Sequence, residues 1–229
     1  GAGPMEGAAR EGYPMDVAVE GRSSPFVLPQ FAVQIYREKL LRDEDSLAWL
    51  NAELLKEGRR LRETDEDGKA WSEQNYPGGY TSYGSQRSLN RICPAASELE
   101  AWLTRHVRTY LATLQLEGVP ELFMTDCWIN IMGPGTEHIF HQHGSSTVSG
   151  TYYVQTPAGC PGISFEDPCL DRIAASGRRR VVEYPVRAGE VVLFESWLRH
   201  RVAPNEASED RVSVSFNYHW RYEQPGGGR

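Results

Sequence analysis

The sequence predicts a mainly β chain with N-terminal helices, an α+β fold in which the helices pack on a jelly-roll. Apolar residues recur with helical spacing between about residues 43 and 116. From about residue 121 to residue 222 the pattern changes to short apolar or alternating stretches, separated by turns rich in Gly, Pro and Asn. Regularly spaced short strands of this kind are typical of antiparallel sandwiches and barrels.

Two helices are predicted, over residues 43–62 and about 97–116, because leucines and other apolar residues form one stripe on each. His106 lies on the second stripe, which predicts a packed core histidine. The segment 63–86 between the helices is rich in turn residues and aromatics, and is predicted as a structured loop with neither helix nor central strand. Its YPGGYTSYG stretch is expected to form a flap near the site.

Eight strands are predicted after Gly118. They cover about 121–132, 138–143, 148–155, 162–166, 179–185, 190–194, 199–203 and 211–220. Helices and strands together are expected to form a single domain over residues 26–222. Residues 1–25 are expected to be a flexible arm and 223–229 a flexible tail, because neither has apolar periodicity.

The composition restricts the class of protein. The chain has 229 residues, of which 40% are hydrophobic, enough for one substantial core and too many for a disordered chain. The formal net charge of −7 argues against a nucleic-acid partner. We expect no membrane helix, since apolar runs are short, and a cytoplasmic location, since no secretory signal is visible. For such a protein Cys160 and Cys169, which bracket a predicted hairpin, are expected to be reduced thiols.

The segment 138-HIFHQH-143 carries the first sign of chemistry. If residues 141–143 are extended, His141 and His143 lie on one face of a strand and can converge on one metal ion. His138 is three and five residues away from them, so strand alternation places it on the opposite face and outside the ligand set.

A second group of polar residues begins with His200. A jelly-roll iron site takes two ligands from one strand and a third from a distant strand, which predicts His200 as the third ligand. Arg211 and Ser213 follow on the next strand, two residues apart and therefore on one face. A buried Arg needs an anion, and a carboxylate fits its two-donor fork. The alternative is a surface ion pair of Arg211 with Glu209 or Asp210, worth under about 1 kcal/mol.

Five stretches resemble the 2-oxoglutarate- and Fe(II)-dependent oxygenases, specifically a mainly bacterial and phage group of 2OG-Fe(II) oxygenases. They are NYPGGYTSY (75–83), WINIMGPGTEHIFHQHGSSTVSGTYYV (128–154), GISFEDP (162–168), AGEVVLFESWLRHRV (188–202) and RVSVSFN (211–217). Together they cover most of residues 75–220.

The resemblance implies a double-stranded β-helix that uses Fe(II), 2-oxoglutarate as cosubstrate and O2. It implies His141 and His200 as iron ligands. It also implies Arg211 and Ser213 as the clamp on the distal carboxylate of 2-oxoglutarate. Tyr153 matches a position where related enzymes place a hydroxyl on that carboxylate, and Asn130 is a weaker candidate for a cosubstrate contact.

One departure from the superfamily concerns the first strand, which usually carries H-x-D or H-x-E. This chain has neither pattern anywhere. Either His143 replaces the carboxylate or its position is not a ligand. The group that the chain resembles carries HxH, which favours a three-His ferrous site of His141, His143 and His200.

Two alternative functions stay open at this point. One is a cupin-like three-His metalloenzyme that does not use 2-oxoglutarate, and the other is a non-catalytic jelly-roll binding module. The arginine and serine at 211 and 213 distinguish the oxygenase from the first, and the histidines distinguish both enzymes from the second. The sequence does not identify the substrate, which is either a small molecule or a protein side chain. It does not predict the oligomeric state either, and a dimer is one possibility.

Overall fold

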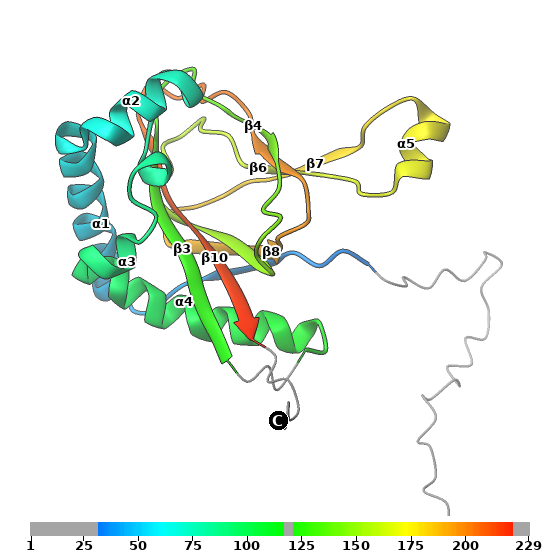
Figure 1. Cartoon of the computed structure of the whole chain (residues 1–229), viewed down its shortest axis with the longest axis horizontal. Coiled ribbons are helices and arrows are strands. Elements are labelled where there is room, and N and C mark those ends of the chain that lie inside the picture. Colours follow the sequence, from blue (N-terminus) through cyan, green and yellow to red (C-terminus); the bar gives the residue numbers. More distant parts are fainter. Residues whose placement is uncertain (1–31, 117–120, 222–229) are drawn as a thin grey trace, which may run out of the picture. The chain divides into compact units, whose positions relative to one another are not determined.

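The computed structural model describes residues 32–116 and 121–221 (Figure 1). The expected arm over residues 1–25 and the expected tail over 223–229 lie outside these ranges. The chain divides after Val33, and the account below concerns the unit that begins at Gln34.

Both predicted helices are confirmed. Helix α1 spans Glu44–Thr64 and begins where the Asp43 carboxylate accepts a hydrogen bond from the Ser46 backbone N–H at 2.8 Å. Helix α4 spans Pro94–Thr113, with Pro in its first turn, where the missing N–H costs nothing. His106 on α4 is packed but only half-buried, and its ring lies between the Tyr36 hydroxyl at 2.8 Å and the Leu40 carbonyl at 3.0 Å.

The predicted loop over residues 63–86 is wrong in its first half, which forms helix α2 over Glu66–Asn75. Asp65 explains the helix, because its Oδ1 atom accepts from the Gly68 backbone N–H at 3.0 Å and so caps the first turn. Its other oxygen accepts from the Tyr80 hydroxyl at 2.7 Å, which ties the following turn segment back to the cap. That segment holds strand β2 (Tyr80–Thr81), a 3-10 turn (Ser82–Gly84) and helix α3 (Leu89–Ile92).

Two antiparallel sheets form the rest of the unit. The six-stranded sheet has the order β1-β8-β5-β10-β3-β2, and the four-stranded sheet has the order β4-β9-β6-β7. The strands not yet bounded are β1 (Tyr36–Lys39), β3 (Glu121–Met132), β4 (His138–His141), β5 (Val148–Gln155), β6 (Ile163–Glu166), β7 (Val181–Tyr184), β8 (Glu190–Glu195), β9 (His200–Val202) and β10 (Arg211–Arg221). The predicted jelly-roll is therefore confirmed, and each of its eight predicted strands has a counterpart, although β4 ends at His141, two residues before the predicted end. Strands β1 and β2 and helix α5 (Leu170–Ser176) were not predicted.

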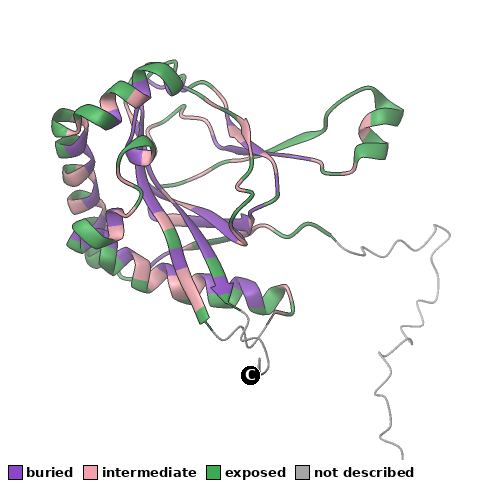
Figure 2. Ribbon diagram, in the orientation of Figure 1, coloured by how far each residue is buried: buried purple, intermediate pink, exposed green. Residues whose placement is uncertain are grey.

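The six-stranded sheet separates two regions of the core (Figure 2). On one face α1 and α4 pack against the sheet, with Leu54, Leu103 and Phe216 all fully buried. Residues of the opposite face, among them Tyr153 and Phe194, pack against the four-stranded sheet. Strand alternation therefore presents every second residue of β3, β5 and β10 to the space between the sheets.

Two further findings bear on the sequence predictions. None of the helices in the described ranges is long and apolar enough to cross a bilayer. All four cysteines are free thiols, two of them buried.

The space around Gly150 on β5 tests how tightly the side chains on the helix-facing side of the six-stranded sheet are packed. A Cβ atom at this position would lie 2.6 Å from Leu193 Cδ2 and 2.6 Å from Phe216 Cζ, both of which are buried. We expect Gly150→Ala to lower the free energy of unfolding by about 1–3 kcal/mol through overpacking. Gly144→Ala is the control, since no atom lies within 4 Å of its Cβ position. Denaturant unfolding measures both, and equal midpoints for the two variants would contradict the packing described.

Candidate active site

A cavity of about 440 Å³ lies between the two sheets and is closed on one side by the segment from α2 to the 3-10 turn. This volume is typical of a small-molecule site. Four histidines and one arginine lie in its lining, and three of its six large aromatic side chains form one row. These residues are His138, His141, His143, His200, Arg211, Trp71, Tyr83 and Trp128.

Three of the histidines form a cluster. The ring nitrogens that His141, His143 and His200 offer lie within 4.8 Å of one another. The His141 and His200 ring centroids are 4.3 Å apart, and each is 5.2 Å from that of His143. Three imidazoles at this spacing suit one transition-metal ion.

The backbone explains how the three rings converge. His141 ends β4 and pairs with His200, which begins β9. His143 does not lie on a strand, contrary to the predicted strand over 138–143. Its backbone N–H donates to the Ser196 carbonyl at 2.9 Å, and this bond holds the residue against the end of β8. The convergence of His141 and His143 is thus produced by the chain leaving the strand.

Two of the rings have a defined tautomer. The Nδ1 atom of His141 lies 2.8 Å from the Ile139 carbonyl oxygen, and that of His200 lies 2.9 Å from the Leu198 carbonyl oxygen. A carbonyl only accepts, so Nδ1 carries the proton in both rings. Their Nε2 atoms therefore keep a lone pair, the form in which histidine binds a metal.

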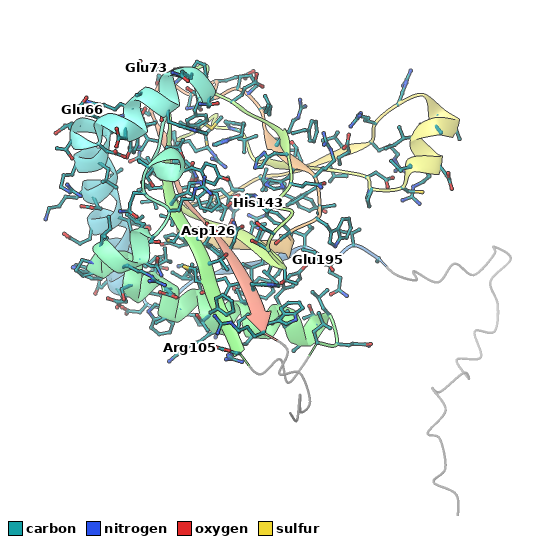
Figure 3. The ribbon with its side chains drawn as sticks, in the orientation of Figure 1. Glu66, Glu73, Arg105, Asp126, His143 and Glu195 are labelled. Carbon is teal, nitrogen blue, oxygen red and sulfur yellow. The ribbon has the colours of Figure 1, made fainter. Side chains whose placement is uncertain are left out.

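The electrostatics keep the cluster neutral. Burial lowers the pKa of His141 and, more strongly, that of His200, and the neighbouring rings lower the His200 pKa further. Burial and His141 together lower the pKa of His143 to about 4, although the Asp126 carboxylate acts in the opposite direction (Figure 3). Asp126 is fixed on β3 by the Asn217 amide, which donates to it at 3.2 Å. At neutral pH all three rings are therefore neutral, each with one N–H and one nitrogen lone pair.

His138 lines the same cavity, and the predicted placement on the opposite face is wrong. The β4–β9 register shifts between His138 and His141, so simple alternation fails there. The His138 ring lies over Tyr76, with centroids 4.3 Å apart, and its centroid is 6.3 Å from that of His141. It is outside the three-His cluster. That His138 is not a metal ligand therefore stays a prediction, which now rests on the position of its ring and no longer on strand alternation.

Arg211 is buried without a carboxylate partner. Its side chain is 2% exposed, and among the described residues its guanidinium has one polar contact, from Nη1 to Met132 Sδ at 3.9 Å. The guanidinium lies 5.1 Å from the centre of the Tyr153 ring, and its Nε–H has no partner. The alternative surface ion pair is wrong, because Asp210 pairs with Arg62 at 2.7 Å.

Several hydroxyl groups accompany Arg211. Ser213 is buried on β10, opposite Tyr153 on β5 and Asn130 on β3. The hydroxyls of Tyr153 and Tyr76 are buried without a partner. Burial raises the pKa of both phenols, that of Tyr153 to about 12, while Arg211 lowers both, so each stays a hydrogen-bond donor at neutral pH. Together with Arg211 these groups form a cradle suited to an anion.

The structure also bears on Asn130, which the sequence predicts as a cosubstrate contact, and on Tyr76, which it does not select. Asn130 lies in the cavity wall, but its amide already accepts from Thr81 Oγ1 at 2.8 Å and donates to Ser215 Oγ at 3.0 Å. Tyr76 was not predicted as a site residue. The signal that points to it is the NYPGGYTSY stretch, which the sequence placed near the site without selecting a residue.

Comparison with known proteins agrees with this geometry. Residues 126–217 match the model of the family described as “Putative 2OG-Fe(II) oxygenase”. No curated protein sequence matches the chain.

Solved structures share the fold. A prolyl-4-hydroxylase from Pseudomonas putida is 20% identical, with 82% of this chain and 94% of that chain covered and a TM-score of 0.54. The epimerase SnoN from nogalamycin biosynthesis, crystallised with Fe3+, α-ketoglutarate and nogalamycin RO, is 15% identical, with coverage of 86% and 88% and a TM-score of 0.59. EctD from S. alaskensis, with 2-oxoglutarate and 5-hydroxyectoine, is 14% identical, with coverage of 82% and 72% and a TM-score of 0.59.

The matched segment contains the three clustered histidines, Arg211, Ser213 and Tyr153, and the fold around it is the double-stranded β-helix that the sequence predicts. Over residues 126–217 this chain is therefore similar to the family described as “Putative 2OG-Fe(II) oxygenase”.

Proposed function

We propose that this protein is an Fe(II)- and 2-oxoglutarate-dependent dioxygenase of the hydroxylase type. The observation that carries the proposal is the presence, in one cavity, of three neutral histidines and a buried arginine that lacks a counter-charge. The histidines suit a ferrous ion, and the arginine suits the distal carboxylate of the cosubstrate. The match of residues 126–217 to the model of the oxygenase family supports the same proposal.

The donor set fits Fe(II). His141, His143 and His200 would hold the ion through unprotonated ring nitrogens, and the backbone bonds at Nδ1 orient the rings of the first and the third. A three-His set is neutral, so the ion keeps its full charge until an anionic cosubstrate binds, whereas a carboxylate ligand would cancel one unit. The chemistry that bound Fe(II) supplies is activation of O2, coupled to oxidative decarboxylation of 2-oxoglutarate to succinate and CO2.

The cradle fits the far end of 2-oxoglutarate. Arg211 offers two parallel donors and stays protonated at any working pH. Ser213, Tyr153 and Tyr76 each place a hydroxyl nearby, and the two phenols have no other partner. A buried cation without a partner is costly, so a bound carboxylate relieves an unfavourable state of the free protein. Arg211 and these hydroxyls therefore bind and orient the cosubstrate.

Apolar side chains form part of the surroundings of the site. Phe194 and Ile163 line the cavity beside the metal cluster, with the Phe194 ring centroid 4.5 Å from that of His200, while Val202 packs with Tyr76 and Met132. A low-polarity enclosure strengthens each charge–charge contact inside and limits loss of reactive species to solvent.

We extend the proposal to the setting of the enzyme. The substrate is a small molecule or a protein side chain, and the enzyme works in a reducing compartment such as the cytoplasm. The four free thiols support the latter, and the net charge of −7 supports a partner other than nucleic acid.

The ligand set predicts which histidines the metal needs. We expect wild type to bind one Fe(II) per chain, and His141→Ala, His143→Ala and His200→Ala to weaken binding by more than about a hundredfold, since each removes a direct ligand. His138→Ala is the matched control and should keep the metal, because its ring lies in the same cavity but outside the cluster. Anaerobic metal analysis after dialysis measures all four. Undiminished affinity in His200→Ala would overturn the assignment.

The cradle predicts the effect of removing its charge. Arg211→Met would leave a buried carboxylate unpaired, at a cost of about 3–5 kcal/mol, or roughly two to three and a half decades in 2-oxoglutarate affinity. Tyr76→Phe removes one charge-assisted hydrogen bond and should weaken binding by about one to two decades. Iron affinity should not change in either variant. Anaerobic calorimetry measures the cosubstrate affinity, with the exposed Arg187→Met as control.

Two outcomes would contradict the cradle. Equal affinity in wild type and Arg211→Met removes this arginine from the cosubstrate site. Failure of wild-type Fe(II) protein to bind 2-oxoglutarate at millimolar concentration favours the cupin-like enzyme that does not use it.

A further inference from the structure

Three of the six large aromatic side chains in the cavity pack against one another, apart from the metal cluster and the cradle. Trp71 comes from α2, Tyr83 from the 3-10 turn and Trp128 from β3. Their rings pack edge to face in a row, with centroids 5.7 Å apart from Trp71 to Tyr83 and 5.1 Å apart from Tyr83 to Trp128. The Trp128 centroid is in turn 5.9 Å from that of His143. The row, here named the aromatic wall, thus runs from the cavity rim to the metal cluster.

The backbone holds the wall in place before any ligand binds. A Cβ atom on Gly84 would lie 2.2 Å from Trp71 Cγ, so only glycine permits the observed position of this indole. The Asn75 amide donates to the Trp71 carbonyl at 2.9 Å. The Arg87 guanidinium lies 4.0 Å from the centre of the Tyr83 ring and donates to the Tyr83 carbonyl at 2.9 Å. Preorganised rings lose little conformational entropy when a ligand packs on them.

The partial exposure of its residues indicates that the aromatic wall can contact a ligand. Trp128 is buried, whereas Trp71 and Tyr83 are only half-buried although each has aromatic neighbours. Apolar rings that stay accessible inside a concave site are typical of ligand recognition, and they pack best against another ring or a flat apolar group.

The charges lining the cavity narrow the class of ligand. Among the described residues that line it, Arg211 and Glu137 are the charged side chains, apart from the neutral histidines. The cosubstrate uses Arg211, which leaves no lining cation for an anionic substrate, and Arg87, which stacks on Tyr83, is exposed to solvent and outside the lining. Glu137 is exposed at the rim, where solvent screens it and its attraction for a cation is weak. An anion buried beside the wall would therefore lose its hydration without gaining a partner.

We propose that the aromatic wall is the substrate subsite and that it takes an uncharged aromatic or flat alicyclic ring. The proposal rests on the proposed function, because it places the ring beside the metal cluster. Such a ring belongs either to a free small molecule or to an aromatic residue of a peptide, and both share the chemistry that Trp71, Tyr83 and Trp128 recognise.

A set of indole probes tests the charge rule. Ligand-observed NMR measures the dissociation constants of indole, indole-3-acetate, tryptamine and N-acetyltryptophanamide with the full chain in saturating 2-oxoglutarate, so that Arg211 is already paired. We expect indole to bind at least about tenfold more tightly than indole-3-acetate, whose carboxylate finds no partner, and at least as tightly as tryptamine. Tighter binding of N-acetyltryptophanamide than of indole assigns the peptide source, and weaker binding assigns the free molecule. Equal binding of indole-3-acetate, tighter binding of tryptamine or no binding of indole at millimolar concentration overturns the proposal.

Variants locate the subsite. Trp71→Ala and Gly84→Ala, which respectively remove and displace the same ring, should each weaken indole binding by about tenfold. Trp197→Ala is the matched control, because this tryptophan is 45% exposed and does not line the cavity. Unchanged indole affinity in both cavity variants, or an equal loss in the control, overturns the assignment.

Binding of 2-oxoglutarate to the same variants separates the two proposals. Retained 2-oxoglutarate affinity in Trp71→Ala shows that the variant is folded. If wild type binds 2-oxoglutarate but no indole, the subsite is wrong and the dioxygenase stands. If it binds indole but no 2-oxoglutarate, the proposed function fails while the subsite remains.

Discussion

The arrangement of the site depends on a positive charge that the fold buries without a partner. Arg211 begins β10 on the face that looks into the space between the sheets, while Val212 on the other face packs among core residues. Two buried phenols beside it also lack partners. Native proteins seldom keep such groups unsatisfied unless a ligand completes them. The free protein therefore buries an uncompensated positive charge at Arg211, and a bound anionic cosubstrate would neutralise it.

The two sheets supply different parts of the site. The six-stranded sheet, supported from behind by α1 and α4, supplies Arg211, Tyr153 and Trp128 from long strands whose alternation leaves little freedom (Figure 1). The four-stranded sheet supplies His141 and His200 from the ends of short paired strands. The cosubstrate cradle is thus built on rigid backbone, and the metal cluster lies where the strands end. This division agrees with a site that must bind two ligands in a fixed relation.

Sequence reasoning was most successful where strand alternation holds. Arg211 and Ser213 share a face of β10, as predicted, because β10 is long and pairs on both sides. It failed where the chain leaves regular structure. The register shift in β4 brings His138 into the cavity. His143 converges with His141 because its backbone N–H donates to the Ser196 carbonyl, and this hydrogen bond cannot be predicted from the local sequence. Helix α2 was missed because its cap, Asp65, stands among turn residues, and with it the aromatic wall and Tyr76 were missed.

The central claim is that the three-His cluster and the Arg211 cradle hold a ferrous ion and 2-oxoglutarate together. Anaerobic titration of the Fe(II)-loaded protein with 2-oxoglutarate, followed by visible absorption, tests it most directly. Chelation of the ion by the keto acid gives a metal-to-ligand charge-transfer band, so we expect a band that saturates at one equivalent of 2-oxoglutarate per iron. An iron-loaded protein that develops no band at millimolar 2-oxoglutarate would contradict the account.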